Sequence, residues 1–228
     1  MRLLSSLIKP SCIVCHKTED WLCKDCQSLL KAHEDICPIC HHYSLAGRVC
    51  EECKKKYKPQ IEGITIAFKN TPIIKKLIYK FKAKHQKDIW RFFSQFLYRE
   101  LKRNPFLKGE TALSFVPSFW TKNLLSRGYQ PSYILAKNLA QNSNLPLLKL
   151  CKKIKNTKSQ IHLDKEQRKI NVLGSWAYIG TKQKLSFDNI VIIDDITTTW
   201  TTLNEIAKCI KTQQPNLTIR GIAIARSA

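Results

Sequence analysis

The chain has 228 residues, 43% of them hydrophobic, which suits one large domain or a small module joined to a medium one. No stretch approaches the roughly 18 apolar residues that a membrane span needs. Met1–Pro10 lacks the length and the cleavage pattern of a secretory signal. These features argue against a membrane-spanning or secreted protein. We therefore expect a cytoplasmic protein whose thiols are reduced.

The net charge of +22 is concentrated in two parts of the chain. The excess is +12 from Cys53 to Glu110 and +6 from Lys149 to Lys169. Such an excess favours a polyanionic partner, either nucleic acid or, less often, an anionic membrane. The alternative is a solvated basic face in a protein from a lysine-rich proteome.

Eight of the ten cysteines lie in the first quarter of the chain, in four C-x2-C pairs. A C-x2-C turn points two thiolates at one ion, and two such turns complete a tetrahedral zinc site. Four pairs therefore predict two zinc sites. Sequential pairing gives two ribbons, and interleaved pairing is an alternative that the sequence leaves open. The sequential sites are Cys12, Cys15, Cys23 and Cys26, then Cys37, Cys40, Cys50 and Cys53.

The predicted zinc ions are structural, because four thiolates leave no coordination position for a substrate. A module of about 45 residues is too small to be stable by its core alone, so the metal would supply folding free energy. Lys54–Pro59 is a charged link that ends in proline. It predicts a boundary between a zinc module, residues 1–57, and a second domain, residues 58–228. Four histidines lie among the cysteines, and each could replace a thiolate or lie outside the coordination sphere: His16, His33, His41 and His42.

The second domain is predicted to begin with a strand, two helices and a strand. Gly63–Phe68 is the first strand, and Thr71-Pro72 is a typical helix start with a capping threonine and proline at the first helical position. The apolar helical pattern breaks at Lys80–Lys87, and Asp88 caps a second helix. Leu113–Val116 is the next strand.

The remaining elements continue the alternation. Pro131–Gln141 predicts a helix, and the polar, basic stretch Lys152–Lys169 predicts a mobile loop or arm. Ile190–Ile193 predicts a strand, Leu203–Thr212 a helix and Leu217–Ala225 a final strand. Strands that alternate with helices indicate an α/β fold with a parallel sheet.

Residues 190–203 carry the motif with the clearest chemistry. Four apolar residues predict a strand buried on both faces, and two carboxylates follow directly. A hydroxyl-rich loop then leads to a helix N-terminus, whose N–H groups can hold a phosphate. The carboxylates suit ribose hydroxyls or a Mg²⁺ ion held with a phosphate, since ligands bind beyond the carboxyl ends of parallel strands. The residues expected at this site are Asp194, Asp195, Thr197, Thr198, Thr199, Trp200, Thr201 and Thr202.

This run resembles the phosphoribosyl pyrophosphate (PRPP) motif of type I phosphoribosyltransferases, which has four apolar residues, two acids and a Thr-Thr-Gly-x-Thr loop. Together with the Cys pairs, three further stretches resemble the ComF/ComFC family of competence proteins, which are amidophosphoribosyltransferase-like and related to GntX. These stretches are Lys80-Phe81-Lys82, then Pro117 with Arg127-Gly128-Tyr129-Gln130, and the pattern Thr157, Gln160, Leu163, Arg168, Asn171, Val172 and Gly174. The resemblance covers nearly the whole chain.

The resemblance implies a type I phosphoribosyltransferase-like parallel sheet behind a small zinc module. It implies a competence factor that handles incoming single-stranded DNA in natural transformation and binds PRPP with Mg²⁺. On the pyrophosphate side it points to Pro117, Ser118 and Arg127. The partners it suggests are the inner-membrane DNA translocation machinery or a helicase, with the protein peripheral at the inner membrane.

Three positions depart from the family pattern. Trp200 stands at the loop glycine, Gln130-Pro131 at the Asn-Gln pair, and Ser118 within the Pro-x-Pro element. A tight phosphate turn often needs glycine for a positive φ or a close approach. The Trp200 N–H group can still point at a phosphate, and its ring would either stack on a base or pack inside the domain.

Two functions compete at this point. The first is a DNA-uptake factor that binds single-stranded DNA through lysines and aromatic rings. The densest basic cluster beside aromatic residues is Lys80, Lys82, Lys84 and Lys87. The second is an active phosphoribosyltransferase that moves ribose 5-phosphate from PRPP to a base or amine, which needs a closed site with Mg²⁺ on the pyrophosphate. The sequence shows no general base for such a reaction. That absence, Trp200 and the charge favour the first function.

Overall fold

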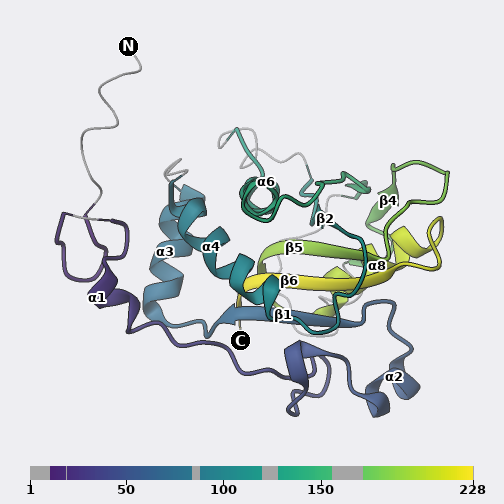
Figure 1. The fold of residues 1–228 in the computed structure, drawn as a ribbon, viewed down its shortest axis with the longest axis horizontal. Coiled ribbons are helices and arrows are strands. Elements are labelled where there is room, and N and C mark those ends of the chain that lie inside the picture. Colours follow the sequence, from purple (N-terminus) through teal and green to yellow (C-terminus); the bar gives the residue numbers. More distant parts are fainter. Residues whose placement is uncertain (1–10, 19, 84–87, 120–127, 156–171, 228) are drawn as a thin grey trace.

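The computed structural model describes residues 11–18, 20–83, 88–119, 128–155 and 172–227. Figure 1 shows a central sheet with helices on both of its faces and, below and to one side, two small modules from the N-terminal quarter of the chain. Within the described ranges, none of the helices has the length and apolar character to cross a membrane.

The central sheet has four parallel strands in the order β1-β6-β5-β2. Their bounds are β1 Gly63–Phe68, β2 Thr111–Phe115, β5 Asn189–Thr197 and β6 Thr218–Arg226. All residues of β1 and β2 are buried, as are the first six of β5. Continuous burial is typical of parallel strands that are covered on both faces, and it confirms the predicted α/β class.

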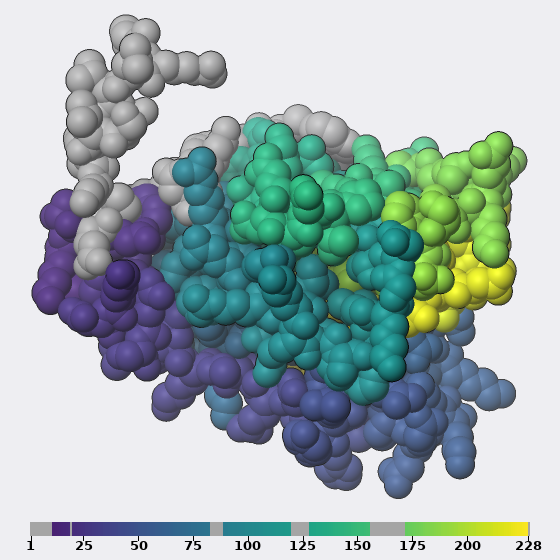
Figure 2. Space-filling view, in the orientation of Figure 1, coloured from purple at the N-terminus to yellow at the C-terminus, as the bar shows by residue number. Residues whose placement is uncertain are grey.

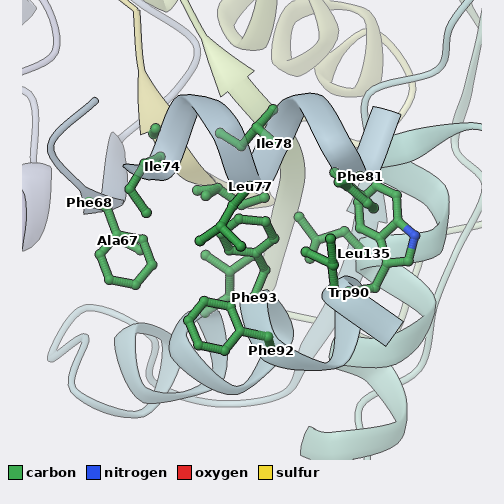
Figure 3. Packing of buried hydrophobic residues seen from close by; sticks show 14 of the residues in the cluster. Ala67, Phe68, Ile74, Leu77, Ile78, Phe81, Trp90, Phe92, Phe93 and Leu135 are labelled. Carbon is green, nitrogen blue, oxygen red and sulfur yellow. The ribbon is translucent and has the colours of Figure 1, made fainter. Parts of the chain in front are cut away.

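One face of the sheet is covered by α3 (Pro72–Ala83), α4 (Asp88–Lys102) and α6 (Pro131–Ser143). Val191 and Ile193 of β5 point into this core. Figure 3 shows its centre, where residues of α3 and α4 pack around Phe81, Trp90 and Leu135. Successive strand side chains point to opposite faces, so alternate residues of β5 belong to this layer.

The other face is covered by α8 (Trp200–Lys211) and by a two-stranded antiparallel hairpin. The hairpin strands are β3 (Cys151–Lys153) and β4 (Trp176–Tyr178). Ile190 and Ile192 of β5 point into this second core. The strand that precedes the two acids is therefore held from both sides.

Several bounds differ from the predicted ones, three of them in or near the region of the acid pair and the basic stretch. β5 continues through Thr197 instead of ending at Ile193, because β6 runs alongside it and pairs as far as Arg226. α8 begins at Trp200, three residues before the predicted start. The predicted loop 152–169 begins as strand β3, and most of the remaining loop lies outside the described residues.

The two Cys modules share one design. In each, a turn carries the first C-x2-C pair, and a short helix carries the second pair at its N-terminus: α1 (Lys24–Gln27) and α2 (Glu51–Tyr57). Figure 1 shows the modules at opposite ends of the view, joined by an extended segment. In Figure 2 the first module (purple) borders the helical layer and the second (blue) lies along the lower side.

Both modules pack against the α/β domain. Cys12, Leu22 and Cys26 belong to the same hydrophobic core as Leu77 and Phe81 of α3. The boundary after residue 57 stays a prediction, and the structure shows a core that is continuous across it.

The second module is attached through a buried arginine on β6. Arg220 is 2% exposed, and its guanidinium donates a hydrogen bond of 2.6 Å to the carbonyl of Ala46 in the short 3-10 helix η1 (Leu45–Gly47). The same group lies over the ring of Phe106 at 5.1 Å. Burial lowers the pKa of Arg220 to about 10, so the side chain stays charged at neutral pH.

Candidate functional site

The two predicted carboxylates lie within the last part of β5, at the carboxyl edge of the sheet. Asp194 is 8% exposed, and its carboxylate accepts a hydrogen bond of 2.9 Å from the backbone N–H of Asp195. Asp195 Oδ2 lies 2.5 Å from the ammonium nitrogen of Lys82 in α3. The structure therefore brings together the acid pair and one lysine of the predicted DNA cluster.

The neighbouring acids have opposite charge preferences. Burial raises the pKa of Asp194 well above its ordinary value, and the charge of Asp195 raises it further. Burial also acts to raise the pKa of Asp195, but the Lys82 ammonium outweighs it and holds that pKa below its ordinary value. One acid of the pair is thus kept ionised, and the other is poised to hold a proton.

A second lysine, in the hairpin, lies close enough to Asp194 to feel its charge. Burial lowers the pKa of Lys153 in β3, and the charge of nearby Asp194 opposes this shift. Its ammonium also lies 5.3 Å from the centre of the Trp176 ring. The sequence analysis did not single out Lys153, because it is one of several lysines in a stretch without periodicity. The one sequence signal near Lys153 is Cys151, an apolar residue two positions earlier in a short segment that suits a strand.

The hydroxyl-rich run splits into a strand end and a helix start. The Thr197 hydroxyl donates to the Thr199 carbonyl at 3.1 Å, and Thr199 and Thr201 join through their hydroxyls. Thr199 is the N-cap residue of α8, so Trp200, Thr201 and Thr202 form the first helical turn. The N–H groups of that turn have no partner within the helix, and such groups suit an anion. Thr198 lies between the two parts.

The position of Trp200 in the structure explains why tryptophan is tolerated where the family pattern has glycine. Because Trp200 begins a helix and does not have a positive φ, a side chain at this position causes no backbone strain. Its ring contacts the Tyr57 ring edge-on with a centroid distance of 6.3 Å. Of the two roles expected for this ring, the structure shows packing against the second Cys module.

Two stretches named in the sequence analysis meet at the end of α3. The Tyr129 hydroxyl donates to the carbonyl of Phe81 at 2.5 Å, next to Lys82. Gly128 has a φ of 69°, a backbone conformation that favours glycine over other residues. The glycine before Tyr129 is therefore needed for the backbone turn. This contact fixes the turn of α3 that carries the lysine of the ion pair.

The other predicted residues are more scattered. The Pro117 carbonyl accepts a hydrogen bond of 3.3 Å from the Trp176 indole, and Ser118 beside it is half-buried. Lys80 is half-buried, with its ammonium 5.7 Å from the centre of the Trp21 ring. Arg127, Lys84 and Lys87 lie outside the described residues.

The cysteines gather into two groups that follow the sequential pairing. The groups are Cys12, Cys15, Cys23 and Cys26, then Cys37, Cys40, Cys50 and Cys53, and within each group all Sγ atoms lie within 4.8 Å of one another. Tetrahedral zinc with Zn–S bonds of ~2.3 Å places sulfurs about 3.8 Å apart, so the clusters fit this ion. None of the four histidines, all of which the structure describes, belongs to either cluster.

Three curated proteins are similar to this chain over most of its length. Competence protein F of Haemophilus influenzae is 28% identical over 212 residues, which are 88% of this chain and 90% of that protein. Competence protein ComFC of Bacillus subtilis is 24% identical over 220 residues, 92% of this chain and 86% of the other. DNA utilization protein YhgH of Salmonella typhimurium is 25% identical over 195 residues, 82% of each chain.

Two further similarities are partial. Residues 1–115 match the family model of the tRNA synthetases class I (M), a range that contains both Cys clusters and neither acid of the site. The solved "Structure of the allosteric regulatory enzyme of purine biosynthesis" aligns with a TM-score of 0.37 at 15% identity, over 61% of this chain. The chain spans a quarter of that protein's length, since the alignment covers 25% of it.

The fold and the clusters define a class of protein: a mixed α/β protein with a parallel sheet and two N-terminal clusters of four cysteines that could hold zinc. Relatives at 24–28% identity extend over both parts together. Over most of its length the chain is similar to competence protein F and to ComFC.

Proposed function

We propose that this protein handles incoming single-stranded DNA in natural transformation, and that it binds the strand together with PRPP and Mg²⁺. The names of its relatives, two competence proteins and a DNA utilization protein, support the competence role. The ligand proposal rests on one observation: the half-buried Asp195, paired with Lys82, and its buried neighbour Asp194 lie beside the N-terminus of α8 at the carboxyl edge of the sheet. A cytoplasmic position beside the inner-membrane DNA translocation machinery or a helicase fits this role.

Different residues of the site would bind different groups of PRPP. Asp194 and Asp195 would accept hydrogen bonds from the ribose hydroxyls, since carboxylates are strong acceptors. The free N–H groups at the start of α8 and the hydroxyls of Thr197 to Thr202 would hold the 5′-phosphate. Lys82 and Lys153 bring positive charge to the site, which favours a pyrophosphate group that carries Mg²⁺.

Calorimetry with PRPP and Mg²⁺ tests the ligand. The wild type should bind, and the double variant Asp194→Ala, Asp195→Ala should lose most of the affinity. The matched control is Asp188→Ala, a carboxylate at the opposite edge of the sheet. Equal PRPP affinity in the wild type and the double variant would show that the site is misassigned.

The alternative function is an active phosphoribosyltransferase. The observation in its favour is the pair of lysines beside the two acids, because lysines can stabilise a leaving pyrophosphate. Pyrophosphate release from PRPP, measured with a panel of bases and amines, separates the two functions. Release that depends on an acceptor and is lost in Asp195→Ala would favour the enzyme. PRPP binding without release would favour the DNA-handling function.

A further inference from the structure

A cleft of about 670 Å³ lies between the second Cys module and the carboxyl edge of the sheet. Its walls come from segments far apart in the sequence: the chain before and within the second module, the start of α3, and the end of β6. The polar lining residues are His33, His41, Lys69, Asn70, Lys75 and Arg226. Neither the acid pair nor the lysine cluster predicted from the sequence forms part of it.

The cleft carries a net positive charge. Among the described residues, the cleft is lined by the cations Lys69, Lys75 and Arg226 and by one carboxylate, Glu34, which lies 2.5 Å from the Lys69 ammonium. Arg226 donates a hydrogen bond of 2.5 Å to Nε2 of His41, which acts as the acceptor and leaves the guanidinium charge unneutralised. The exposed Lys75 ammonium makes no hydrogen bond or ion pair with the described residues. The surplus of positive charge suits an anion.

Groups that can contact bases lie in or next to the same cleft. The amide oxygen of Asn70 is buried and has no hydrogen-bond partner among the described residues, so it is available to a donor such as a base N–H. Tyr43 is 78% exposed and pairs across an antiparallel bridge with Ile36, another lining residue. An exposed aromatic ring next to a basic groove is typical of sites that bind unpaired bases by stacking.

The cleft is continuous with the loop that follows the acid pair. His33, Glu34 and Arg226 line the cleft and also a narrow crevice, and Thr197, Thr199 and Trp200 form another side of that crevice. A chain molecule held in the cleft would therefore lie beside the proposed PRPP site.

We propose that this cleft binds the phosphate backbone of single-stranded DNA. The inference deepens the proposed function and rests on it. The volume of the cleft, about 670 Å³, lies in the ~300–1,000 Å³ range of ligand sites. Bases that contact Asn70 and Tyr43 must be unpaired, which favours a single strand over a duplex. Lys69, Lys75 and Arg226 contact phosphates, while Asn70 and Tyr43 contact the bases. The second Cys module would take part in DNA binding, because His41 and its neighbours form one wall of the cleft.

The test compares two double variants that remove the same charge. Lys69→Ala, Lys75→Ala changes the cleft, and Lys182→Ala, Lys184→Ala changes two exposed lysines that precede β5 at the opposite edge of the sheet. The readout is the fluorescence anisotropy of a labelled oligothymidylate at several salt concentrations. The cleft variant should bind on the order of tenfold more weakly, and its salt slope should fall by about 0.7 for each lost phosphate contact. The control should keep both values.

A gain-of-affinity variant guards against misfolding as the cause of a loss. Glu34→Gln removes the carboxylate that lines the cleft among the described residues and should strengthen binding several-fold, whereas Glu110→Gln at the opposite edge should not. If the wild type binds the oligonucleotide and the cleft variants match their controls, the cleft is not the site, although the proposed function stands. If the wild type binds PRPP but no single-stranded DNA, the DNA part of the proposed function fails and the cleft inference fails with it.

Discussion

The ammonium of Lys82 lies 2.5 Å from Oδ2 of Asp195, which ties the last turn of α3 to the end of β5. This one contact joins two stretches that resemble family motifs and are far apart in the sequence. It also sets the charges of the site. Lys82 lowers the pKa of Asp195 and keeps it ionised, and the charge of Asp195 together with burial raises the pKa of Asp194.

We expect the two acids to respond in opposite directions to the same substitution. The pKa of Asp194 is raised on folding, so its contribution to stability is full below the unfolded pKa and is lost as the pH rises through the folded pKa. Asp194→Asn should therefore raise the free energy of unfolding by about 1–2 kcal/mol at a pH above the folded pKa. The gain should shrink as the pH is lowered.

Asp195→Asn is the matched comparison. The pKa of Asp195 is lowered on folding, so its contribution is present above the unfolded pKa and is lost as the pH falls through the folded pKa. The variant should lose about 1–2 kcal/mol at neutral pH and little in acid. Urea unfolding curves at several pH values check both variants, and effects of equal sign would contradict the charge assignment.

The Lys82–Asp195 contact should appear as a coupling energy. Lys82→Met leaves a half-buried carboxylate without its cation, and Asp195→Asn leaves the lysine without its anion. The double variant should be destabilised by less than the sum of the two, with a coupling of about 1–2 kcal/mol for a pair that is partly accessible to water. A double-mutant cycle from equilibrium unfolding measures it, and additive effects would show that the pair does not form in solution.

Elemental analysis should find about two zinc ions per chain, one for each closed cluster of four cysteines. Cys15→Ser and Cys40→Ser should each lose one ion and keep the other, because the two clusters share no ligand. Chelation should lower the thermal midpoint of the whole protein, since the first cluster lies in the same core as α3. Loss of both ions from either single variant would instead indicate shared ligands.

Restoring the family's loop glycine should destabilise this protein. Trp200→Gly removes the contact with Tyr57 and places glycine in a helical turn that does not need it. We expect a loss of about 2–4 kcal/mol from the missing aromatic packing and the helix penalty. Trp200→Phe should recover much of that loss. Thermal melts of the two variants provide the measurement, and a Gly variant as stable as the wild type would show that the ring does not pack as described.

Local sequence patterns predicted most of the main elements. β1 has the predicted bounds, and α3 begins at the proline that the capping pattern marks. These signals are local, since they depend on alternation, helical periodicity and capping. The sequence left sequential and interleaved grouping of the cysteines open, and the structure groups them sequentially.

Features that depend on tertiary contacts were missed. The hairpin β3–β4 has strands of only three residues, too short for a periodic pattern, so Lys153 was not recognised beside Asp194. The partner of Lys82 and the buried position of Arg220 depend on which distant segments meet. A lysine or arginine in the sequence gives no sign of this, because either residue is more often exposed.

The position of β6 has a consequence for synthesis. The last strand of the chain lies between β1 and β5, and its Arg220 also holds the second Cys module in place. While the C-terminal segment is still inside the ribosome, β1 and β5 have no partner between them and the sheet is split into two unpaired edges. The protein can therefore complete its fold only after the final residues have emerged, and chains that terminate early should be recognised by proteases as unfolded.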